Sequence, residues 1–266
     1  MTFVVAVTRW ARPIDQELAA LAPLAELAAY DLRLRLAGPL PVVFRQVADA
    51  DSARELLAAL RGRGHGVVAC DLAFVPSSAT MTTPRSYRLT DRELIAIHPA
   101  WGERPLAFGE ILALIRAKAA RVKQTSSTTK DKKLSLGRAV VTGGLAMRKS
   151  TTQRQRTEVE EREQVLYLIR RTGRDPFLLR EQQLRHQGLG PQVKPTSLEN
   201  FTTLVALLQQ RAPHALYDDR LVTHRRKTAM TGLAGSTAEQ VTSSSNASDT
   251  DLAAHLIAVA HLEGQL

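Results

Sequence analysis

The feature that most constrains this chain is a strongly basic segment in the middle of the sequence. From Arg116 to Arg156 there are twelve basic residues and one acidic residue, Asp131, so the segment carries +11, whereas the whole 266-residue chain carries +10. Residues 122–164 are polar and rich in β-branched side chains, and Thr, Gln and Arg alternate toward their end, which predicts a long, solvent-exposed strand. Apolar residues still make up 44% of the chain, so we expect a folded, globular protein.

The basic segment is the binding surface that the sequence predicts. A local charge of this size attracts polyanions such as nucleic acid, anionic lipid or an acidic protein surface. The alternative is a solvated edge whose charge only prevents aggregation. The candidate partner-binding residues are Lys118, Arg121, Lys123, Lys130, Lys132, Lys133, Arg138, Arg148, Lys149, Arg154 and Arg156.

The N-terminal part of the chain opens with a strand pattern followed by a helix pattern. Residues 2–8 are rich in Val and Phe, which predicts a short buried strand. Apolar residues at helical spacing follow Pro13, and Pro23 interrupts them, so we expect a break or two short helices. The next run, YDLRLRL, fits either a strand or a helix.

The strand and helix patterns repeat once more before residue 75. Residues 42–47 predict a strand, and Asp49 or Asp51 is expected to cap the helix DSARELLAALRGRG. The run HGVVACDLAFV predicts the next strand. This order of elements predicts a small α/β sandwich over residues 1–75.

Part of this region resembles a known domain. The stretch from LAELAAYDLRLRLAGPLPVVF through ADSARELLAALRGRGHGVVACD, about residues 25–75, resembles the C-terminal domain of the ribosomal stalk protein. That family places a short helix pair before a strand–helix–strand unit. It also carries a lysine-rich factor-binding helix, where this sequence has Arg33 and Arg35, so the resemblance implies the fold alone. The matching residues are Ala53, Leu56, Leu57, Leu60, Gly64, Val67 and Val68.

The sequence beyond residue 86 is dominated by strand patterns. Residues 87–97 hold two short strand signals around a turn, and residues 105–121 predict a short helical corner that leads into a strand. Residues 165–170 are expected to pair with residues 177–184 across the turn TGRDP.

An amphipathic helix follows these strands. Thr196-Ser197-Leu198-Glu199 has the form of a capping box, with Ser or Thr at the cap. Several strands, a basic strand region and one closing helix together resemble a bacterial pleckstrin-homology-like barrel over residues 87–212. The resemblance implies a non-enzymatic module that binds lipids, peptides or other proteins. The helix is expected to bury Leu198, Phe201, Leu204, Val205 and Leu208.

The sequence therefore predicts an α+β protein with two domains. A small α/β sandwich domain comes first, and a mainly antiparallel, barrel-like β domain with a closing C-terminal helix comes second. The expected segments are 1–75 for the α/β domain, 76–86 for a linker, 87–222 for the β-rich domain with its basic strand region 116–156, 223–250 for a flexible linker and 251–266 for the C-terminal helix.

The residue types that carry catalysis are not arranged as a site. The single cysteine, Cys70, excludes an internal disulfide and is expected to be a small buried hydrophobe at the end of a strand. Neither a metal-binding histidine spacing nor a phosphate-binding glycine motif occurs. We predict no enzyme activity, no metal and no small-molecule cofactor. The carboxylates expected to face nearby arginines rather than to form an acid/base pair are Glu158, Glu160, Glu161 and Glu163.

The N-terminus indicates a cytoplasmic protein. The apolar run Phe3–Val7 is too short for a signal peptide and no basic residue precedes it. No stretch approaches about 18 uninterrupted apolar residues. We expect a bacterial cytoplasm.

The function that these observations predict is a non-enzymatic binding or adaptor protein whose basic surface binds an acidic partner. One alternative is a protein that associates with nucleic acid or the ribosome through the same surface. A second alternative is peripheral attachment to an anionic membrane through the basic surface and the apolar insert Ala139–Met147. Exposed strands would also allow a homo-oligomer.

Overall fold

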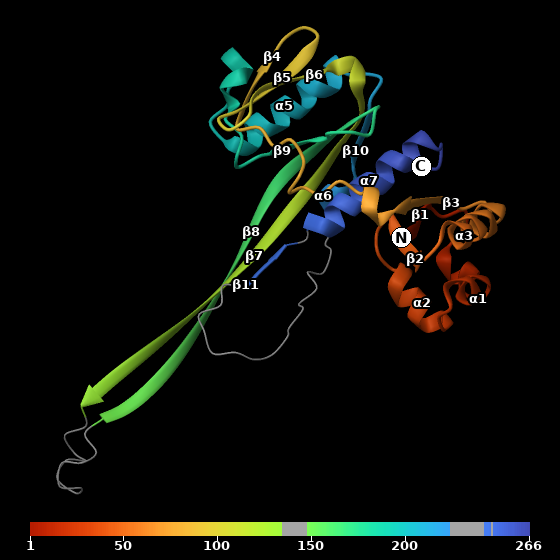
Figure 1. Ribbon diagram of the computed structural model, residues 1–266, viewed down its shortest axis with the longest axis horizontal. Coiled ribbons are helices and arrows are strands. Elements are labelled where there is room, and N and C mark those ends of the chain that lie inside the picture. Colours follow the sequence, from red (N-terminus) through yellow and green to blue (C-terminus); the bar gives the residue numbers. More distant parts are fainter. Residues whose placement is uncertain (135–147, 224–241, 246) are drawn as a thin grey trace, which may run out of the picture. The chain divides into compact units, whose positions relative to one another are not determined.

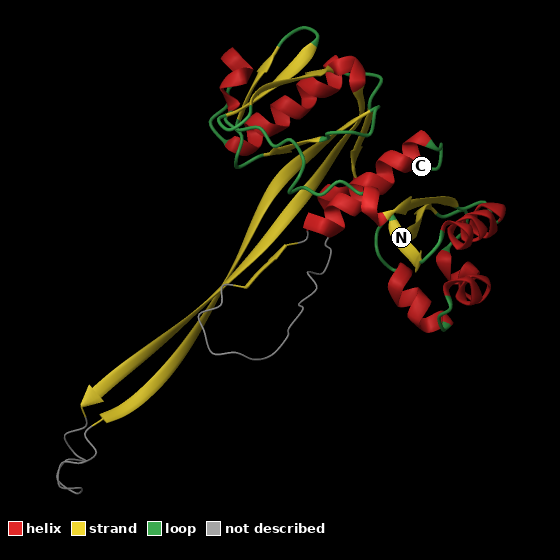
Figure 2. Ribbon diagram, viewed as in Figure 1, coloured by secondary structure: helices red, strands yellow, loops and turns green. Residues whose placement is uncertain are grey.

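The α+β class predicted from the sequence is confirmed (Figures 1 and 2). The computed structural model describes residues 1–134, 148–223, 242–245 and 247–266. Within this part of the chain, no helix is long and apolar enough to cross a membrane. The domain boundaries given above stay a prediction. The chain forms two compact units, one of Met1–Ala119, Glu163–Arg226 and Asn246–Leu266 and the other of Ala120–Arg162 and Lys227–Ser245.

The N-terminal sheet is antiparallel, with the first strand in its centre. Its order is β2-β1-β3, and Phe3 of the central strand lies opposite Val47 on one side and Asp71 on the other. All three strands were expected from their apolar runs. Their bounds are β1 (Phe3–Arg9), β2 (Val42–Val47) and β3 (Gly66–Asp71).

Three helices accompany this sheet: α1 (Ile14–Ala25), α2 (Ala29–Leu36) and α3 (Ala50–Gly62). Pro23 lies in the last turn of α1, and Glu26 then adopts a left-handed φ of 55°, so the predicted break separates α1 from α2. The run YDLRLRL is helical. The side chain of Asp49 accepts a hydrogen bond from the Ser52 amide at 2.7 Å, so Asp49 rather than Asp51 caps α3.

Both faces of the N-terminal sheet are covered. Val5 and Val7 belong to the core formed with α1, α2 and α3, whereas Val4 and Ala6 pack against α7 (Ala247–Leu262). Because side chains alternate between the faces of a strand, β1 must be apolar at successive positions, and its run VVAV meets that requirement. The C-terminal helix thus packs on the N-terminal sheet.

Two further sheets make up the rest of the described strands. One has the order β10-β7-β8-β9, with β11 also paired to β7, and the other has the order β4-β5-β6. The first holds β7 (Ile111–Leu134), β8 (Arg148–Arg170), β9 (Phe177–Arg180), β10 (Leu216–Asp219) and β11 (Thr242–Ser245). The second holds β4 (Ser86–Leu89), β5 (Glu93–His98) and β6 (Gly102–Ala107).

Short helical turns and two helices connect these strands. Leu72–Phe74 (η1), Phe108–Glu110 (η2) and His186–Gln192 (η3) are 3₁₀ turns, and η2 is the predicted helical corner before β7. The remaining helices are α5 (Ser197–Arg211) and α6 (Arg220–Thr223).

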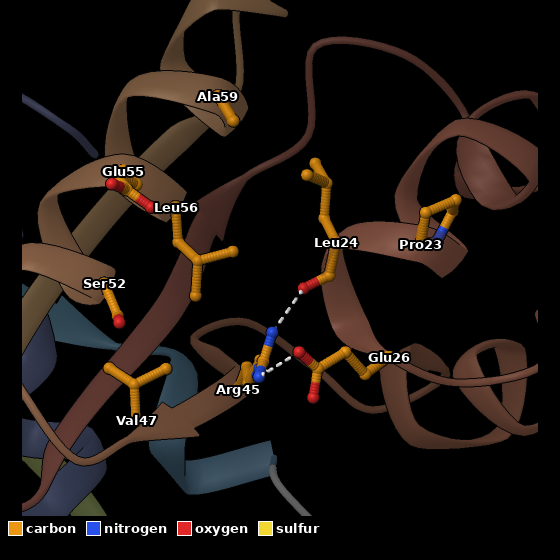
Figure 3. Close-up of a pocket in the computed structure, with 9 residues that line it drawn as sticks. All are labelled: Pro23, Leu24, Glu26, Arg45, Val47, Ser52, Glu55, Leu56 and Ala59. Carbon is orange, nitrogen blue, oxygen red and sulfur yellow. Dashed lines mark hydrogen bonds and ion pairs between the residues drawn. The ribbon is translucent and has the colours of Figure 1, made fainter.

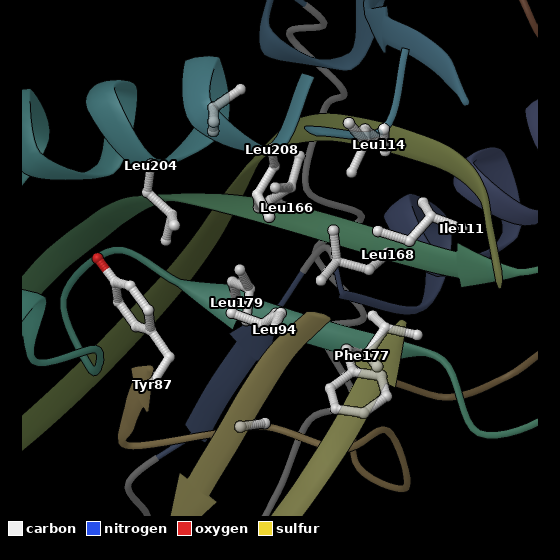
Figure 4. Close-up of a cluster of buried hydrophobic side chains, with 14 of the residues drawn as sticks. Tyr87, Leu94, Ile111, Leu114, Leu166, Leu168, Phe177, Leu179, Leu204 and Leu208 are labelled. Atoms are coloured by element: carbon white, nitrogen blue, oxygen red, sulfur yellow. The ribbon is translucent and has the colours of Figure 1, made fainter. Parts of the chain in front are cut away.

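A large apolar core lies between α5 and the two sheets (Figure 4). Leu166 and Leu168 of β8 meet Leu94 of β5, and Leu204 and Leu208 of α5 complete the cluster. The predicted pairing of the strands near residues 165 and 177 is confirmed, with Val165 opposite Arg180. Isolated bridges also connect strands to segments outside the sheets, as between Phe177 of β9 and Thr82.

The capping box at the start of α5 is confirmed, with Thr196 as the cap. The Thr196 hydroxyl accepts a hydrogen bond from the Glu199 amide at 3.2 Å, and the Glu199 carboxylate accepts one from the Thr196 amide at 3.3 Å. The expected burial of Leu198 is wrong, because its side chain is 46% exposed. The buried stretch of α5 begins only at Asn200, so the first turn extends beyond the core.

The helix α7 is apolar around its circumference because it packs on two sheets. Ala254 and Ile257 belong to the core formed with β7, β8 and β9, and Leu256 and Ala260 belong to the core formed with β1 and β3. A helix that is apolar on all sides is typically buried. The helix begins at Ala247 and not at residue 251 as expected. The strand β11 also lies inside the segment 223–250 that was predicted to be a linker. Residues 224–241 of that segment lie outside the described residues.

A buried carboxylate on α7 bonds this helix to β8 and to the segment before β4. Asp251 accepts a hydrogen bond from the Tyr167 hydroxyl at 2.8 Å and another from the Ser78 amide at 2.7 Å. Both donors are needed because a buried carboxylate without partners is costly. Burial and the adjacent carboxylate raise the pKa of Tyr167, so this phenol remains a donor.

Candidate functional site

Strands β7 and β8 carry the basic residues that the sequence singles out. The two strands are neighbours in one sheet, so the basic residues before residue 134 and those after residue 148 lie on adjacent strands. We call residues 120–134 of β7 and 148–162 of β8 the basic ribbon. Arg138 and the insert 139–147 lie outside the described residues. On β7 are Lys118, Arg121, Lys123, Lys130, Lys132 and Lys133, and on β8 are Arg148, Lys149, Arg154 and Arg156.

The composition of the basic ribbon sets it apart from the rest of the two strands. It holds ten basic and four acidic residues, and it contains no Phe, Trp or Tyr. Its strands are far longer than the three to ten residues usual in globular proteins. The strand β11 pairs with β7 over Arg121–Gln124, antiparallel. The ribbon therefore offers backbone pairing and positive charge, but few apolar residues with which to form a core.

Next to the ribbon, charges are used within the fold. Arg116 donates hydrogen bonds to Gln164 at 2.7 Å and to Thr202 at 3.2 Å. Glu163 pairs with Arg180, as the sequence analysis expects of this carboxylate. Because these groups have partners within the fold, we assign Arg116 a structural role.

A groove on the N-terminal domain is the second feature with the shape of a site (Figure 3). It has a volume of about 410 Å³, and Leu24 and Leu56 contribute its apolar walls. Arg45 crosses its edge, donates to the Leu24 carbonyl at 3.2 Å and pairs with Glu26 at 2.6 Å. The Ser52 hydroxyl donates to Asp49 at 2.9 Å. These polar groups bond to the end of α1 and the start of α3. They therefore have partners within the fold, and we assign no ligand to the groove.

A buried ionic cluster lies beside the first helix. Glu17 accepts a hydrogen bond from Arg63 at 2.7 Å and lies 3.7 Å from the imidazole Nε2 of His65. The Arg63 guanidinium lowers the pKa of the Glu17 carboxyl, and burial lowers the pKa of His65. His65 also accepts a hydrogen bond from the Ala11 amide at 3.2 Å, so the cluster connects the start of α1 with the turn between α3 and β3. Because the ionic cluster joins these elements, we assign it a role in the stability of the fold.

The single cysteine has no features of a nucleophile. Cys70 is buried near the end of β3, as expected, and burial raises the pKa of its thiol to about 11. Within the described part of the chain, no three or more His, Cys, Asp or Glu residues gather as a metal site would require.

Comparison with known proteins adds no family to this picture. No protein-family model matches the chain, and no curated protein or solved structure matches it either. The resemblances to the stalk-protein domain and to the pleckstrin-homology-like barrel stay predictions.

One cavity gathers residues that the sequence analysis does not single out. Arg85 and His98 line it together with Arg185, which lies a hundred residues further along the chain. No local motif links them. They meet because Ser86 and Arg185 form a parallel bridge, which only the tertiary structure creates.

Proposed function

We propose that this chain is a non-enzymatic binding protein that holds a polyanion on its basic ribbon, and that the polyanion is nucleic acid. The observation that carries the proposal is the placement of Lys and Arg on two adjacent, unusually long strands. Lys and Arg side chains neutralise backbone phosphates and release the counterions that surround them. The major groove of B-form DNA also admits a two-stranded β-ribbon.

The composition of the ribbon favours nucleic acid over the other anionic partners. Stable protein interfaces generally have an apolar or aromatic centre, and the ribbon has no aromatic residue. Peripheral membrane binding also needs apolar residues beside the charge, and in this part of the sequence only the insert Ala139–Met147 between the two basic stretches supplies a run of them. Phosphate backbones need neither feature, because their attraction to Lys and Arg is electrostatic.

The same composition predicts weak sequence specificity. Single-stranded nucleic acid is usually held by aromatic side chains on which bases stack, and these are absent from the ribbon sequence. Contacts to phosphates position a protein on the duplex but carry little sequence information. We therefore expect binding to the backbone of double-stranded or structured nucleic acid.

The charge is not uniform along the ribbon. Residues 121–133 of β7 and 148–156 of β8 hold nine basic residues and one acidic residue, whereas Glu158, Glu160 and Glu161 follow on β8. The three glutamates repel phosphates. The binding part of the ribbon is therefore residues 121–133 of β7 and 148–156 of β8.

The test is equilibrium binding of the full chain to duplex DNA and structured RNA between about 50 and 200 mM salt. Wild-type affinity should fall by roughly a thousandfold over this range, as expected for six or more phosphate contacts. A ribbon variant with seven Gln substitutions should lose binding, and its log–log salt slope should become shallower by up to about 6. The substituted residues are Lys130, Lys132, Lys133, Arg148, Lys149, Arg154 and Arg156.

A matched control variant separates the ribbon from overall charge. It carries seven Gln substitutions at exposed basic positions outside the ribbon and has the same net charge as the ribbon variant. It should bind like the wild type. Equal losses in the two variants, or no binding by the wild type near physiological salt, would overturn the proposal. The control positions are Arg33, Arg54, Arg88, Arg92, Arg171, Arg174 and Lys194.

A further inference from the structure

A cavity beside β4 and β5 has the chemistry of an anion site. Its volume is about 430 Å³, and its lining includes Arg85, Ser86, His98, Gln183 and Arg185. Two of these side chains are guanidiniums and one is an imidazole, whereas none is a carboxylate. Every polar side chain of this set can donate a hydrogen bond.

The backbone holds the two arginines beside each other. The Arg85 amide donates to the Ile97 carbonyl at 2.9 Å, and the Arg185 amide donates to the Arg85 carbonyl at 2.8 Å. Tyr87 and Leu184, one or two residues away, are both buried in the core beneath. Regular pairing and apolar anchors therefore fix the chain on which the cavity residues stand.

The two arginines have no acidic partner. Elsewhere in the same unit arginines pair with carboxylates, as Arg88 does with Glu103 at 3.1 Å and Arg45 with Glu26 at 2.6 Å. Among the described residues, neither Arg85 nor Arg185 forms such a pair. Both residues are exposed, so an anion that enters the cavity can reach two guanidiniums that no carboxylate neutralises.

His98 is oriented by its neighbours. Its Nδ1 accepts a hydrogen bond from the Ala100 amide at 3.1 Å, so the neutral ring carries its proton on Nε2. Its ring stacks on Trp101, with centroids 5.2 Å apart and planes 12° apart, and the Arg104 guanidinium lies 5.0 Å from the Trp101 centroid. The stack fixes the imidazole and leaves its Nε2 proton as a donor.

We propose that this cavity binds a phosphate monoester, whose oxygens accept hydrogen bonds from Arg85, Arg185 and the Nε2 proton of His98. Near neutral pH a phosphate monoester carries a charge of about −1.5 to −2, which two guanidiniums balance. A carboxylate or a phosphodiester carries only one negative charge. The forked donors of arginine also match phosphate oxygens in geometry.

The cavity is large enough for more than the phosphate group. Ile97 and Pro99 add an apolar wall, and the amide of Gln183 adds a polar group that can orient the ester substituent. The ligand is therefore an organic phosphate, either a free small molecule or a phosphorylated side chain. This site is independent of the basic ribbon, because a nucleic-acid backbone offers phosphodiesters.

The test is calorimetric titration of the full chain with phenyl phosphate, a short phosphoserine peptide and dimethyl phosphate. The two monoesters should bind, and the diester should bind at least tenfold more weakly. The double variant R85Q/R185Q should lose at least tenfold in monoester affinity, because each charged hydrogen bond is worth roughly a factor of ten or more. Tighter binding of the peptide would identify a phosphorylated side chain as the ligand, and tighter binding of phenyl phosphate a small molecule.

The matched control is R88Q/R92Q, which removes the same charge from exposed positions of the same hairpin, outside the cavity. It should bind within about twofold of the wild type. The ribbon variant described above should also retain monoester binding, so the failure of one proposal does not imply failure of the other. Unchanged binding by R85Q/R185Q, equal binding of diester and monoester, or loss of monoester binding in the ribbon variant would overturn this assignment.

Discussion

Strands β7 and β8 contain two kinds of sequence, one apolar and one basic, and the contrast separates the part that builds the core from the part that carries the charge. Residues 111–119 and 163–170, the core segments of the two strands, contribute buried apolar side chains to two clusters. Residues 120–134 and 148–162, the basic ribbon, contain almost no large apolar side chain. The same strand pair therefore supplies the core with one part and has a strongly basic sequence in the other.

The contrast extends to the way in which charges are used. In the N-terminal domain, Arg63 and Arg45 pair with Glu17 and Glu26, and each pair joins two elements of the fold. In the ribbon sequence, basic residues outnumber acidic ones by ten to four, so most of them have no acid of the ribbon with which to pair. Paired charge stabilises the fold, and excess charge of one sign is a means of binding a partner.

The largest expected effect is a difference in the free energy of unfolding between a substitution in a core segment and one in the ribbon. Leu168→Ala removes a fully buried side chain from the core beneath α5 and should lower the free energy of unfolding by about 2–5 kcal/mol. Thr128→Ala, on the ribbon, should change it by no more than about 0.5 kcal/mol. Urea unfolding of both variants measures this difference. A loss below about 1 kcal/mol for Leu168→Ala would contradict the assignment of this segment to the core.

A smaller effect concerns the paired charges of the N-terminal domain. Arg63 lowers the pKa of Glu17 below its ordinary 4.5, so the carboxylate contributes stability that is complete above pH 4.5 and is lost as the pH falls through the lowered value. Glu17→Gln should therefore be less stable than the wild type near neutral pH. The difference should shrink as the pH falls below 4.5.

Thermal unfolding of the wild type and Glu17→Gln across pH 3 to 7 measures this difference. The ribbon variant serves as a comparison, because its substitutions change no carboxylate and should leave the acid dependence of the wild type in place. A gap between wild type and Glu17→Gln that stays constant down to pH 3 would show that Glu17 does not titrate as described.

Local patterns predicted the regular elements well, for identifiable reasons. The Thr196 capping box, the Asp49 cap and the strand pair around residues 165 and 177 depend on neighbouring residues, so the sequence alone reveals them. The packing of α7 on two sheets could not be predicted, because an apolar helix sequence indicates burial but not the number of partners. The burial expected of Leu198 failed because helical spacing does not show where the core ends.

The candidate sites divide in the same way. The basic strand region could be predicted because its charges lie close together in the sequence, whereas the pairing of β7 with β8 was not predicted. The cavity at Arg85 and Arg185 could not, since its residues are ordinary surface arginines in sequence and meet only through a tertiary bridge. Charge density is a local property of a sequence, and the absence of an ion-pair partner is a property of the fold.

The most direct test of the central claim is amide hydrogen exchange of the full chain with and without duplex DNA. Core strands usually exchange only through global unfolding, so amides of residues 111–119 and 163–170 should exchange slowly in both states. The claim predicts that DNA slows exchange in residues 121–133 and 148–156 and leaves the N-terminal domain unchanged. Protection that appears elsewhere, or ribbon amides that exchange at the same rate with DNA present, would contradict it.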